Sequence, residues 1–536
     1  MTVGLGNSST LLPQLASWKY PAMDFDHHVI PPFSTTMLQR LVQPMIRTPH
    51  LETFLAKLMA ANNGTQFSIS VVGGSMTAGE GCVSRWTEPK GRRLASAKFH
   101  SWNKCAWSAR LVNWLHHAFP DCVFWLTNHA KRAWGTQVWA LEGIEANPIF
   151  READLVLTDL AINAGVDGIP TKMEKEATAA VWAAALSLPK RPAVLAVEVV
   201  EGIFTRNFYD MDVKFLQKIC PETADQVAFA GRRVREFDHL HATNRSEFRV
   251  CRSEFWPAVW HQQVATTMGI PVVSYHDALW PALDEPDPDF PLFWNGQTHP
   301  SNGTHQRIAD AVAFGISWAA RRLRAMGGSP IGMDDWERAA SRHDNHSRTA
   351  LQQCTPAATR LHPPQDDFQP ASPPVGWEFG EDVVGNSKPG WLARASFATL
   401  RKNISWIEFD AVIGEQRLVL VGHLSSYDPS MGRVQVTLHT GVTGSTAQAL
   451  RSTSQSRALR PLMTWVVDGR WTSPRSVMNY ATLGVPSTVA PGRYQVRFQL
   501  LPSTVRTGSQ AYKHMSWLKV QNDGISRFKL LSLITC

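Results

Sequence analysis

A run of apolar and β-branched residues, Phe67–Val72, stops at Gly73-Gly74-Ser75, and a further glycine follows at Gly79. Such a run is typical of a buried strand, and the glycines remove side-chain bulk on both sides of the serine. A serine at the carboxyl end of a buried strand can offer its hydroxyl to a substrate, as a nucleophile must. Gly and Ser also occur in ordinary strand-to-helix turns for backbone reasons, so both interpretations stay open at this point.

Short apolar runs alternate with amphipathic segments as far as residue 326. This pattern predicts a parallel sheet that is buried on both faces by helices. Ligands of such sheets bind beyond the carboxyl ends of the strands, where Ser75 would lie. An earlier helical stretch, Thr36–Ala61, is broken by Pro44 and Pro49. We predict strands at 67–72, 122–126, 155–160, 193–200 and 271–275, and helices at 101–118, 171–187, 254–268 and 303–326.

The composition changes beyond this α/β region. Residues 327–374 are polar, with little periodicity, which predicts a linker. After it, short β-type runs are separated by Gly, Pro and Ser, which predicts an antiparallel β-sandwich or jelly roll. The pattern leaves open whether this module binds glycan or buttresses the first domain. The strands predicted there are 405–412, 417–424, 433–440, 462–468, 494–500 and 515–520. The domains predicted are 1–64, an N-terminal lead with helices; 65–326, the α/β domain; 327–374, the linker; and 375–536, the β-sandwich.

A histidine, His299, stands in a Gly- and Pro-flanked loop just before the last predicted helix of the α/β region. An unperturbed serine hydroxyl is a poor nucleophile, and such a histidine can supply the base that it needs. Two more residues follow predicted strands. Gly135 lies in the loop after the second strand, and Asn163 ends the apolar run that begins after Asp154. An unobstructed backbone N–H and an amide side chain are the donors that a developing oxyanion requires.

The ordered set Ser75, Gly135, Asn163 and His299 resembles the four signature blocks of the SGNH (GDSL-like) hydrolase superfamily, over roughly residues 65–325. The resemblance implies that Ser75 attacks an ester carbonyl and that His299 acts first as general base and then as general acid. It implies an oxyanion hole made by the Ser75 N–H, the Gly135 N–H and the Asn163 amide. We therefore expect a flavodoxin-like three-layer α/β/α domain with a parallel sheet, followed by the C-terminal antiparallel β-sandwich.

Two positions depart from that family pattern. Gly74 stands where an aspartate is usual, which affects neither the nucleophile nor the base. Gly296 stands where the orienting acid is usual, three residues before the histidine, and the neighbouring Asn295 carries no charge. A carboxylate there would stabilise the imidazolium, and its loss weakens catalysis. A carboxylate from the acidic loop 284–289, a backbone carbonyl or no group at all are the alternatives, and the last leaves a Ser-His dyad or an impaired site.

Length and composition indicate a folded protein of two or three domains, since the 536 residues are 44% apolar and 18% charged. The net charge of +8 is mild for this size, and the basic residues form short scattered clusters, which favours a solvated surface over a nucleic-acid site. Many of the 21 tryptophans follow helical periodicity, which favours core positions over sugar stacking. No run of 18 apolar residues is present, so we predict no membrane span.

Compartment signals are weak and point in different directions. Asn-x-Ser/Thr sequons slightly favour the secretory pathway or an extracellular location. The first residues lack the basic and apolar regions of a signal peptide. The odd number of cysteines, seven, leaves at least one unpaired in a monomer, and a pairing such as Cys220 with Cys251 stays open. The sequons are at Asn7, Asn63, Asn244, Asn302, Asn345 and Asn403.

Rival site chemistries are disfavoured. The cysteines contain no Cys-x-x-Cys pair, and close histidine pairs such as His116-His117 lack a spaced third ligand, so we predict no metal. The glycines around Ser75 lack the lysine of a phosphate-binding loop, and we predict no organic cofactor. Cys82 is an alternative nucleophile, but the glycine-framed strand end favours the serine. His305 is less suited than His299 as the base, because the loop before Pro300 is the freer location for proton transfer.

These features predict a serine esterase that hydrolyses a carboxylic ester, with O-acetyl groups on carbohydrate as the favoured substrate class. Its partner would be a small-molecule or glycan ester. An alternative from another class is a non-catalytic glycan-binding or scaffold protein whose hydrolase fold lost its acid at Gly296. A third alternative is an O-acyltransferase that uses the same residues and a sugar hydroxyl in place of water. The oligomeric state is not indicated by the sequence.

Overall fold

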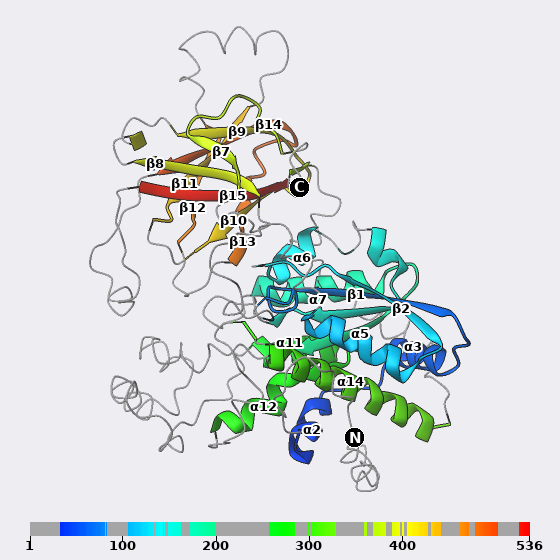
Figure 1. The fold of residues 1–536 in the computed structure, drawn as a ribbon. Coiled ribbons are helices and arrows are strands. Elements are labelled where there is room, and N and C mark those ends of the chain that lie inside the picture. Colours follow the sequence, from blue (N-terminus) through cyan, green and yellow to red (C-terminus); the bar gives the residue numbers. More distant parts are fainter. Residues whose placement is uncertain are drawn as a thin grey trace, which may run out of the picture.

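The computed structural model places an α/β region and a β-rich region one above the other (Figure 1). The β-rich region is built from the C-terminal part of the chain, and the α/β region from the part before residue 327. The residues that the structure describes are 33–80, 82, 105–132, 134–142, 144, 148–161, 172–199, 257–284, 299–300, 302–327, 359–361, 368–381, 389–396, 399–400, 405–426, 430–440, 461–470, 477–501 and 525–536.

The α/β region is organised by a parallel sheet. Its described strands follow the order β2-β1-β3-β4-β5, and every neighbouring pair is parallel. This 2-1-3-4-5 order is that of the flavodoxin-like fold, so the predicted fold class is confirmed. The order changes direction at β1, which puts the end of β1 at the switch point where such sheets bind ligands. The strands are β1 (Thr65–Gly73), β2 (Cys122–Asn128), β3 (Leu155–Asp159), β4 (Ala193–Glu198) and β5 (Val272–Ser274).

Alternate strand residues enter two separate cores, as the period of two in a strand requires. On β3, for example, Leu155 and Leu157 pack into one core and Val156 into the other, and all three are fully buried. Truncation of such a leucine to alanine typically costs about 2–5 kcal/mol. The first core is covered by α2 (Thr35–Val42), α3 (Pro49–Met59), α5 (Trp107–Ala118), α12 (Tyr275–Asp284) and α14 (Asn302–Ala325). The second is covered by α6 (Thr136–Glu142), η3 (Pro148–Glu152), α7 (Lys172–Leu186) and α11 (Pro257–Met268).

The predicted break in the first helical stretch is confirmed. Helix α2 ends at Val42, and α3 begins at Pro49, which occupies the first helical turn where a missing N–H is tolerated. Ser34 and Thr48 cap the two helices through their hydroxyl oxygens, which accept hydrogen bonds from Met37 N and Leu51 N. Both helices therefore start at residues whose side chains satisfy backbone donors.

The β-rich region consists, in its described part, of two antiparallel sheets that enclose one core, so the predicted sandwich architecture is confirmed. One sheet has the order β13-β10-β15-β8-β7, with β6 added beside β15, and the other has the order β12-β11-β14-β9. The pattern predicted none of β6, β7, β8, β13 and β15, and β6 lies within the predicted linker 327–374. The strand predicted at 515–520 lies outside the described residues. The strands are β6 (Thr359–Leu361), β7 (Trp377–Gly380), β8 (Gly390–Ser396), β9 (Trp406–Ile413), β10 (Leu418–Ser425), β11 (Arg433–Thr440), β12 (Met463–Asp468), β13 (Val477–Gly484), β14 (Gly492–Leu501) and β15 (Ile525–Thr535).

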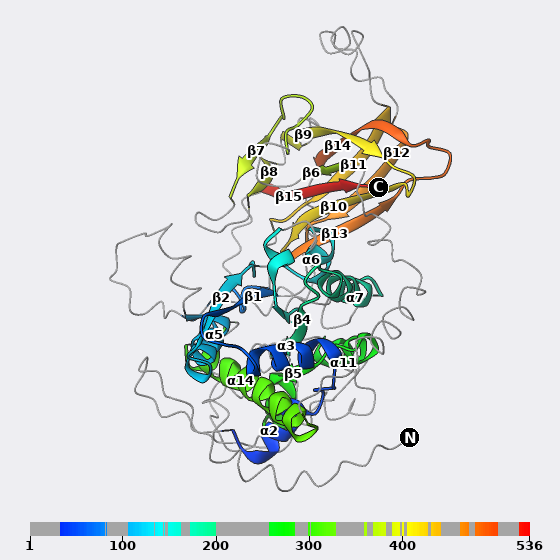
Figure 2. The same ribbon diagram turned by 90° about the vertical axis from the view of Figure 1, so that its right-hand side faces the viewer.

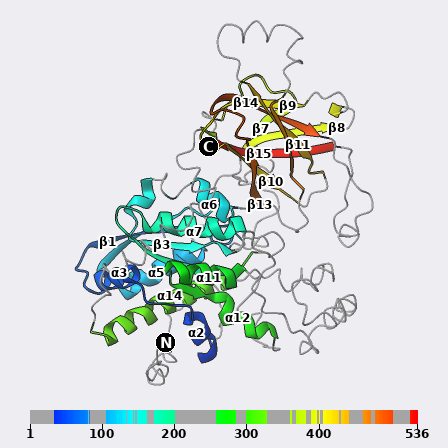
Figure 3. The same ribbon diagram turned by 180° about the vertical axis from the view of Figure 1, so that it is seen from behind.

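The sheet that contains β10, β13 and β15 is buried on both sides. Its inner face enters the sandwich core, and its outer face packs against α6 and α7 of the α/β region, as Figures 2 and 3 show. At this contact Val138 and Leu141 of α6 meet Leu420, Tyr480 and Ile534, and all five are buried. Such packing is what the buttress interpretation of the C-terminal module expects. The domain boundaries themselves stay predictions.

In the described part of the chain, no helix is long and apolar enough to cross a membrane.

Candidate active site

Ser75 lies in a tight turn directly after β1. Hydrogen bonds from Ala78 N to Gly74 O, at 3.0 Å, and from Glu80 N to Ser75 O, at 3.0 Å, close this turn, and Gly79 adopts φ +90°. A side chain at Gly73 would place its Cβ 2.5 Å from Thr77 Oγ1 and 2.9 Å from the Asp159 carbonyl oxygen, so only glycine fits there. The glycines thus let the chain turn sharply at the carboxyl edge of the sheet and present Ser75, which is 8% exposed.

His299 reaches this serine from a distant part of the sequence. Its Nε2 lies 2.9 Å from Ser75 Oγ, which is hydrogen-bond distance. His299 precedes α14 by three residues, and its side chain is 28% exposed. A neutral imidazole with a free lone pair on Nε2 can accept the serine proton in this geometry, as a general base must. The structure therefore joins the nucleophile and the base that were predicted 224 positions apart.

A carboxylate that the sequence did not single out lies beside the same imidazole nitrogen. Glu80 Oε2 is 3.3 Å from His299 Nε2, and it also accepts a hydrogen bond of 2.6 Å from Arg132 Nε. Arg132 Nη2 pairs with the other carboxylate oxygen, so the contact is bidentate. Glu80 is 7% exposed, and burial lowers the pKa of Arg132. The signal for Glu80 was its place at the end of the nucleophile turn, but nothing in the sequence indicated Arg132 as its partner.

Residues at the ends of β2 and β3 form hydrogen bonds with the turn that contains Ser75. Thr77 Oγ1 donates a hydrogen bond of 2.5 Å to Asp159 Oδ2, and Asn128 Nδ2 donates one of 2.8 Å to the Thr77 carbonyl. Burial raises the pKa of Asp159 to about 8, so its carboxyl is largely protonated at neutral pH. Strand β3 ends at Asp159, one residue before the end of the strand predicted at 155–160, and Asn163 lies outside the described residues.

A disulfide between Cys82 and Cys105 links the segment after the nucleophile turn to the start of α5. This bond removes the alternative of Cys82 as a thiol nucleophile, because a disulfide sulfur offers no thiolate. Cys536 is also disulfide-bonded, whereas Cys122 is free and buried. The candidate pairing of Cys220 with Cys251 lies outside the described residues.

The starts of α5 and α14 are fastened to each other by side-chain hydrogen bonds, and α14 begins a few residues after His299. Arg110 of α5 donates hydrogen bonds to Asn302 Oδ1 and, at 2.7 Å, to Gln306 Oε1, both on the first turns of α14. His305 Nδ1 accepts a hydrogen bond of 3.2 Å from Trp107 N, so it caps the amino end of α5. Burial first, then Arg110 and His299, lower the pKa of His305 to about 3. His305 is therefore a buried structural histidine, and the role of His299 as the base stays a prediction.

The remaining predicted site residues are the donors to the oxyanion. Gly135 is buried at the start of α6, where its carbonyl accepts hydrogen bonds from Val138 N and Trp139 N. The loop before Gly135 and helix α6 are both tied to β1, since Lys131 N of the loop and Trp139 Nε1 of α6 each donate to the Gly73 carbonyl at 3.2 Å. Asn163 lies outside the described residues, as do Asn295, Gly296 and the rest of the loop 285–298. The roles of Gly135 and Asn163 stay predictions.

A second hydroxyl-imidazole-carboxylate cluster occurs beneath the carboxyl end of β4. His261 Nε2 lies 3.4 Å from Thr178 Oγ1, and His261 Nδ1 lies 3.2 Å from Glu198 Oε1. These three residues are at most 1% exposed, and Thr178 Oγ1 donates instead to the Glu174 carbonyl at 2.9 Å. No substrate can reach this hydroxyl, so the cluster is a part of the core between α7, α11 and the sheet.

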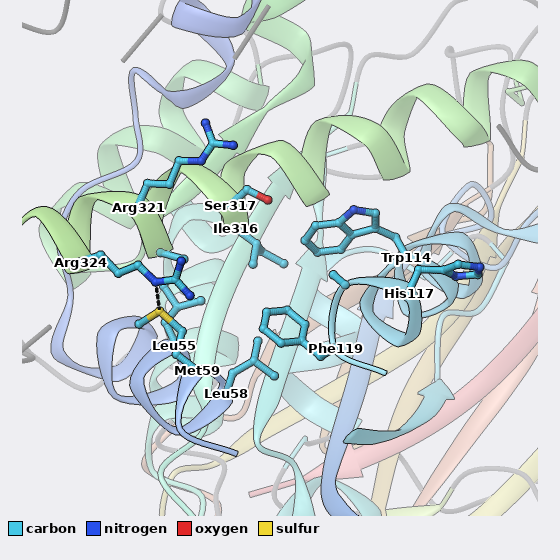
Figure 4. A pocket seen from close by; sticks show the side chains of 12 residues that line it. Leu55, Leu58, Met59, Trp114, His117, Phe119, Ile316, Ser317, Arg321 and Arg324 are labelled. Atoms are coloured by element: carbon cyan, nitrogen blue, oxygen red, sulfur yellow. Dashed lines mark hydrogen bonds between the residues drawn. The ribbon is translucent and has the colours of Figure 1, made fainter. Parts of the chain in front are cut away.

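A pocket of about 350 Å³ lies among the carboxyl ends of α3 and α5 and one side of α14 (Figure 4). Its lining is mostly apolar and includes Leu58, Trp114 and Phe119, and Arg324 Nε reaches Met59 Sδ at its edge. Because α3 and α5 end just before β1 and β2 begin, this pocket lies at the amino edge of the sheet. Ser75 lies at the carboxyl edge, about 30 Å away along a nine-residue strand. The pocket is therefore separate from the Ser75 site.

Among the residues with described positions, no three histidine, cysteine or acidic side chains are grouped as ligands of a metal ion. His116 and His117 are exposed at the end of α5, and His117 Nδ1 contacts the Asn113 carbonyl.

The fold and this site define an α/β protein with a Ser-His pair at the switch point of a parallel sheet and a β-sandwich packed behind it. No protein-family model and no curated protein sequence matches the chain. Among solved structures, a two-domain esterase (CEX) active on acetylated mannans, co-crystallised with mannopentaose, is 14% identical, with a TM-score of 0.50 over 91% of this chain and 94% of that one. A second structure of a two-domain esterase (CEX) active on acetylated mannans gives 13% identity at the same TM-score and coverage.

An alpha/beta hydrolase enzyme from the metagenome of Lake Arreo, Spain, is 15% identical and covers 48% of this chain, but its TM-score of 0.28 is too low to carry an argument. At identities this low, the likeness to the two-domain esterase shows a shared fold across both regions of the chain.

Proposed function

We propose that this protein is a serine esterase of the SGNH type that removes acyl groups, with O-acetyl esters of carbohydrate as its substrate class. The observation that carries the proposal is the contact of 2.9 Å between Ser75 Oγ and His299 Nε2 at the carboxyl edge of the sheet. The two-domain esterase whose fold resembles this chain over 91% of its length is active on acetylated mannans, which supports the same substrate class here.

Acylation follows from this geometry. His299 Nε2 takes the proton of the Ser75 hydroxyl as Oγ attacks the acyl carbonyl carbon. The negative charge that develops on the carbonyl oxygen is stabilised by the Ser75 N–H, the Gly135 N–H and the Asn163 amide in the proposed assignment. The tetrahedral intermediate collapses as the protonated His299 returns its proton to the leaving alcohol oxygen. The products of this half-reaction are a free sugar hydroxyl and an acyl ester on Ser75.

Deacylation repeats the steps with water as the nucleophile. His299 removes a proton from water, and the resulting hydroxide oxygen attacks the acyl carbon. The intermediate releases the carboxylic acid, and the proton on His299 returns to Ser75 Oγ, so the enzyme is restored without any cofactor. An O-acyltransferase would differ only in the second acceptor, which would be a sugar hydroxyl.

The test is the release of acetate from acetylated glucomannan and from p-nitrophenyl acetate by the purified protein and by Ser75→Ala. We expect Ser75→Ala to abolish release, and labelling of the wild-type protein by a fluorophosphonate to map to the peptide that contains Ser75. The matched control is Ser187→Ala, because Ser187 is exposed just after α7 and away from the site. Equal release by wild type and Ser75→Ala would refute the esterase and favour the non-catalytic binder. An acylated acceptor that forms faster than free acetate would identify the transferase instead.

We also propose that the protein works in an oxidising compartment, the secretory pathway or the extracellular space. The disulfide between Cys82 and Cys105 supports this, because such bonds persist in oxidising environments. The sequon at Asn63 supports it too, since Asn63 is exposed in the turn between α3 and β1. Protein isolated from its native cells should lose mass on peptide N-glycosidase treatment, and Asn63→Gln should lose part of that change. Reduced thiols at both Cys82 and Cys105 in freshly isolated protein would contradict the proposal.

A further inference from the structure

We propose that Glu80, held in place by Arg132, is a positioning residue that stabilises the protonated form of His299 and so supplies the negative charge that Gly296 cannot. The inference deepens the proposed function and rests on it. It concerns a residue that lies outside the four signature positions. In the described part of the chain, Glu80 is the carboxylate within ion-pair distance of the His299 imidazole.

The first step is the shared nitrogen. His299 Nε2 faces Ser75 Oγ at 2.9 Å and Glu80 Oε2 at 3.3 Å. When Nε2 carries no proton, it can accept the serine proton. Once that proton has moved, Nε2–H faces a carboxylate oxygen, and the imidazolium that forms is stabilised by an opposite charge. A carboxylate at the family position would act from the other ring nitrogen, so Glu80 replaces its charge but not its control of the tautomer.

The second step is the rigidity of the carboxylate. Both Glu80 oxygens are engaged by Arg132, and the Glu80 side chain is 10% exposed, so it is shielded from solvent and held in one orientation. The cost of this arrangement is electrostatic, because Arg132 offsets part of the negative charge that His299 experiences. A free carboxylate at this distance shifts the titration of a partner by about 1–3 pH units, and partial compensation by Arg132 places the expected effect near the lower end.

The other described titratable and charged groups near His299 are either neutral or already paired. On the side of α14, His305 stays neutral at working pH, since its pKa is lowered to about 3. On α5, Arg110 is engaged by Asn302 and Gln306. Among the described residues, Arg132, from the loop after β2, is a further cation near His299, and it pairs with Glu80. In the described part of the chain, the Glu80-Arg132 pair is therefore the charged pair beside the imidazole, and it can be altered one member at a time.

The experiment compares wild type, Glu80→Gln and Arg132→Gln by two readouts. One is the titration of the His299 imidazole followed by NMR, with the resonance assigned by its loss in His299→Gln. The other is the acid limb of the pH profile of kcat/KM on p-nitrophenyl acetate. We expect Glu80→Gln to move both midpoints down by about one pH unit and to lower kcat about 10- to 100-fold. We expect Arg132→Gln to move both midpoints up, because it exposes the full charge of Glu80.

The opposite directions separate a charge effect from a structural one. If Glu80 only tethers the loop that carries Arg132, both variants lose activity and neither midpoint moves, which would overturn the inference. Glu80→Asp keeps the charge and should keep the wild-type midpoint to within a few tenths of a pH unit, and it serves if Arg132→Gln fails to fold. The matched control is Glu152→Gln, which neutralises an exposed glutamate paired with Lys190 at 3.3 Å and should move neither midpoint.

The NMR titration also distinguishes this inference from the proposed function. A downward shift of the His299 midpoint in Glu80→Gln, in a protein that hydrolyses no ester, would support the charge coupling and refute the esterase. Activity that depends on Ser75, combined with an unmoved midpoint in Glu80→Gln, would support the esterase and refute the role of Glu80.

Discussion

Two clusters in this protein contain a hydroxyl, a histidine and a glutamate, and only one of them is placed to do chemistry. In the first, Ser75, His299 and Glu80 come from loops at the carboxyl edge of the sheet, and the His299 side chain is 28% exposed. In the second, Thr178, His261 and Glu198 come from α7, α11 and the end of β4, and their exposure is at most 1%.

The difference teaches that residue types alone do not define an active site. In the buried cluster, His261 has Thr178 Oγ1 and Glu198 Oε1 as partners inside a core, where an unpaired group costs free energy, although Glu198 Oε2 has no hydrogen-bond partner. The reachable cluster is held by groups around it, including the Asp159 carboxyl, the Cys82–Cys105 disulfide and the clamp between α5 and α14. The Ser75 cluster is a candidate catalytic site because substrate can reach it and the surrounding strand ends and loops hold it rigidly, whereas the Thr178 cluster is not accessible.

The largest expected effect is the contrast between removing the Ser75 hydroxyl from the first cluster and removing the Thr178 hydroxyl from the second. We expect Ser75→Ala to lower kcat/KM for ester hydrolysis by about 10⁴-fold or more, because the nucleophile is lost. We expect Thr178→Val to leave kcat/KM within about twofold, because substrate does not reach that hydroxyl. Steady-state kinetics on p-nitrophenyl acetate measures both. A large loss in Thr178→Val, with its circular dichroism spectrum unchanged, would break the comparison.

The second effect concerns the disulfide next to the reachable cluster, between Cys82 and Cys105. Cys82→Ala/Cys105→Ala opens a loop of 23 residues, and we expect the free energy of unfolding to fall by about 3 kcal/mol. Because the disulfide follows the nucleophile turn, activity should be lost on heating at a lower temperature than for wild type. Urea unfolding and residual activity after heating measure these changes. An unchanged unfolding midpoint would show that the loop is equally constrained without the bond.

The third effect should appear in the buried cluster alone. His261→Leu removes the partner of Glu198 Oε1 from a fully buried position, and we expect a loss of about 2 kcal/mol in unfolding free energy. Its kcat at a temperature where the variant is folded should stay close to that of wild type. His299→Leu should do the reverse, with little change in stability and a loss of about 10³-fold in kcat. If His261→Leu moved the acid limb of the pH profile, the two clusters would be coupled.

The smallest effect concerns His305, which lies behind His299. Its pKa is about 3 in the folded protein, below the ordinary value near 6.5, so the unfolded chain binds the proton first as pH falls. The stability that this neutral ring contributes is present above pH 6.5 and is lost on going toward pH 3, at up to about 1.4 kcal/mol per pH unit.

Denaturation at pH 6 and pH 5 should therefore show a smaller loss for His305→Gln than for wild type, by about 1 kcal/mol. His50 and His129 titrate alike in both proteins. The pKa of Asp159 is raised to about 8 in both proteins, so its contribution to stability increases as pH falls, opposite in sign to that of the histidines. Because these contributions are the same in wild type and variant, they cancel in the difference between the two proteins. Equal losses in the two proteins would mean that His305 is protonated in the folded state.

Much of the scaffold was predictable from local pattern. The apolar runs located every strand of the parallel sheet, and Pro49 marked the start of α3. Helix α6, with seven residues, is too short to show a helical period, and β13 and β15 have burial on both faces, which blurs the alternation that marks a strand.

Some features of the site were also indicated by local sequence pattern, and others were not. The glycine frame of Ser75 and the loop position of His299 are local features, and each follows from what its neighbours allow the backbone to do. Glu80 and Arg132 are separated by 52 positions, and the Cys82–Cys105 bond by 23, and no local rule pairs them.

The amino-acid order by itself thus determined the strands of the parallel sheet and the glycine-framed turn at Ser75, because these depend on hydrophobic period and backbone freedom within a few residues. Only the tertiary structure decided which carboxylate faces the imidazole, which cysteines join and which of two similar clusters a substrate can reach. Those outcomes depend on the packing of segments far apart in the chain, and the distances between such segments are fixed by the folded sheet and its helices.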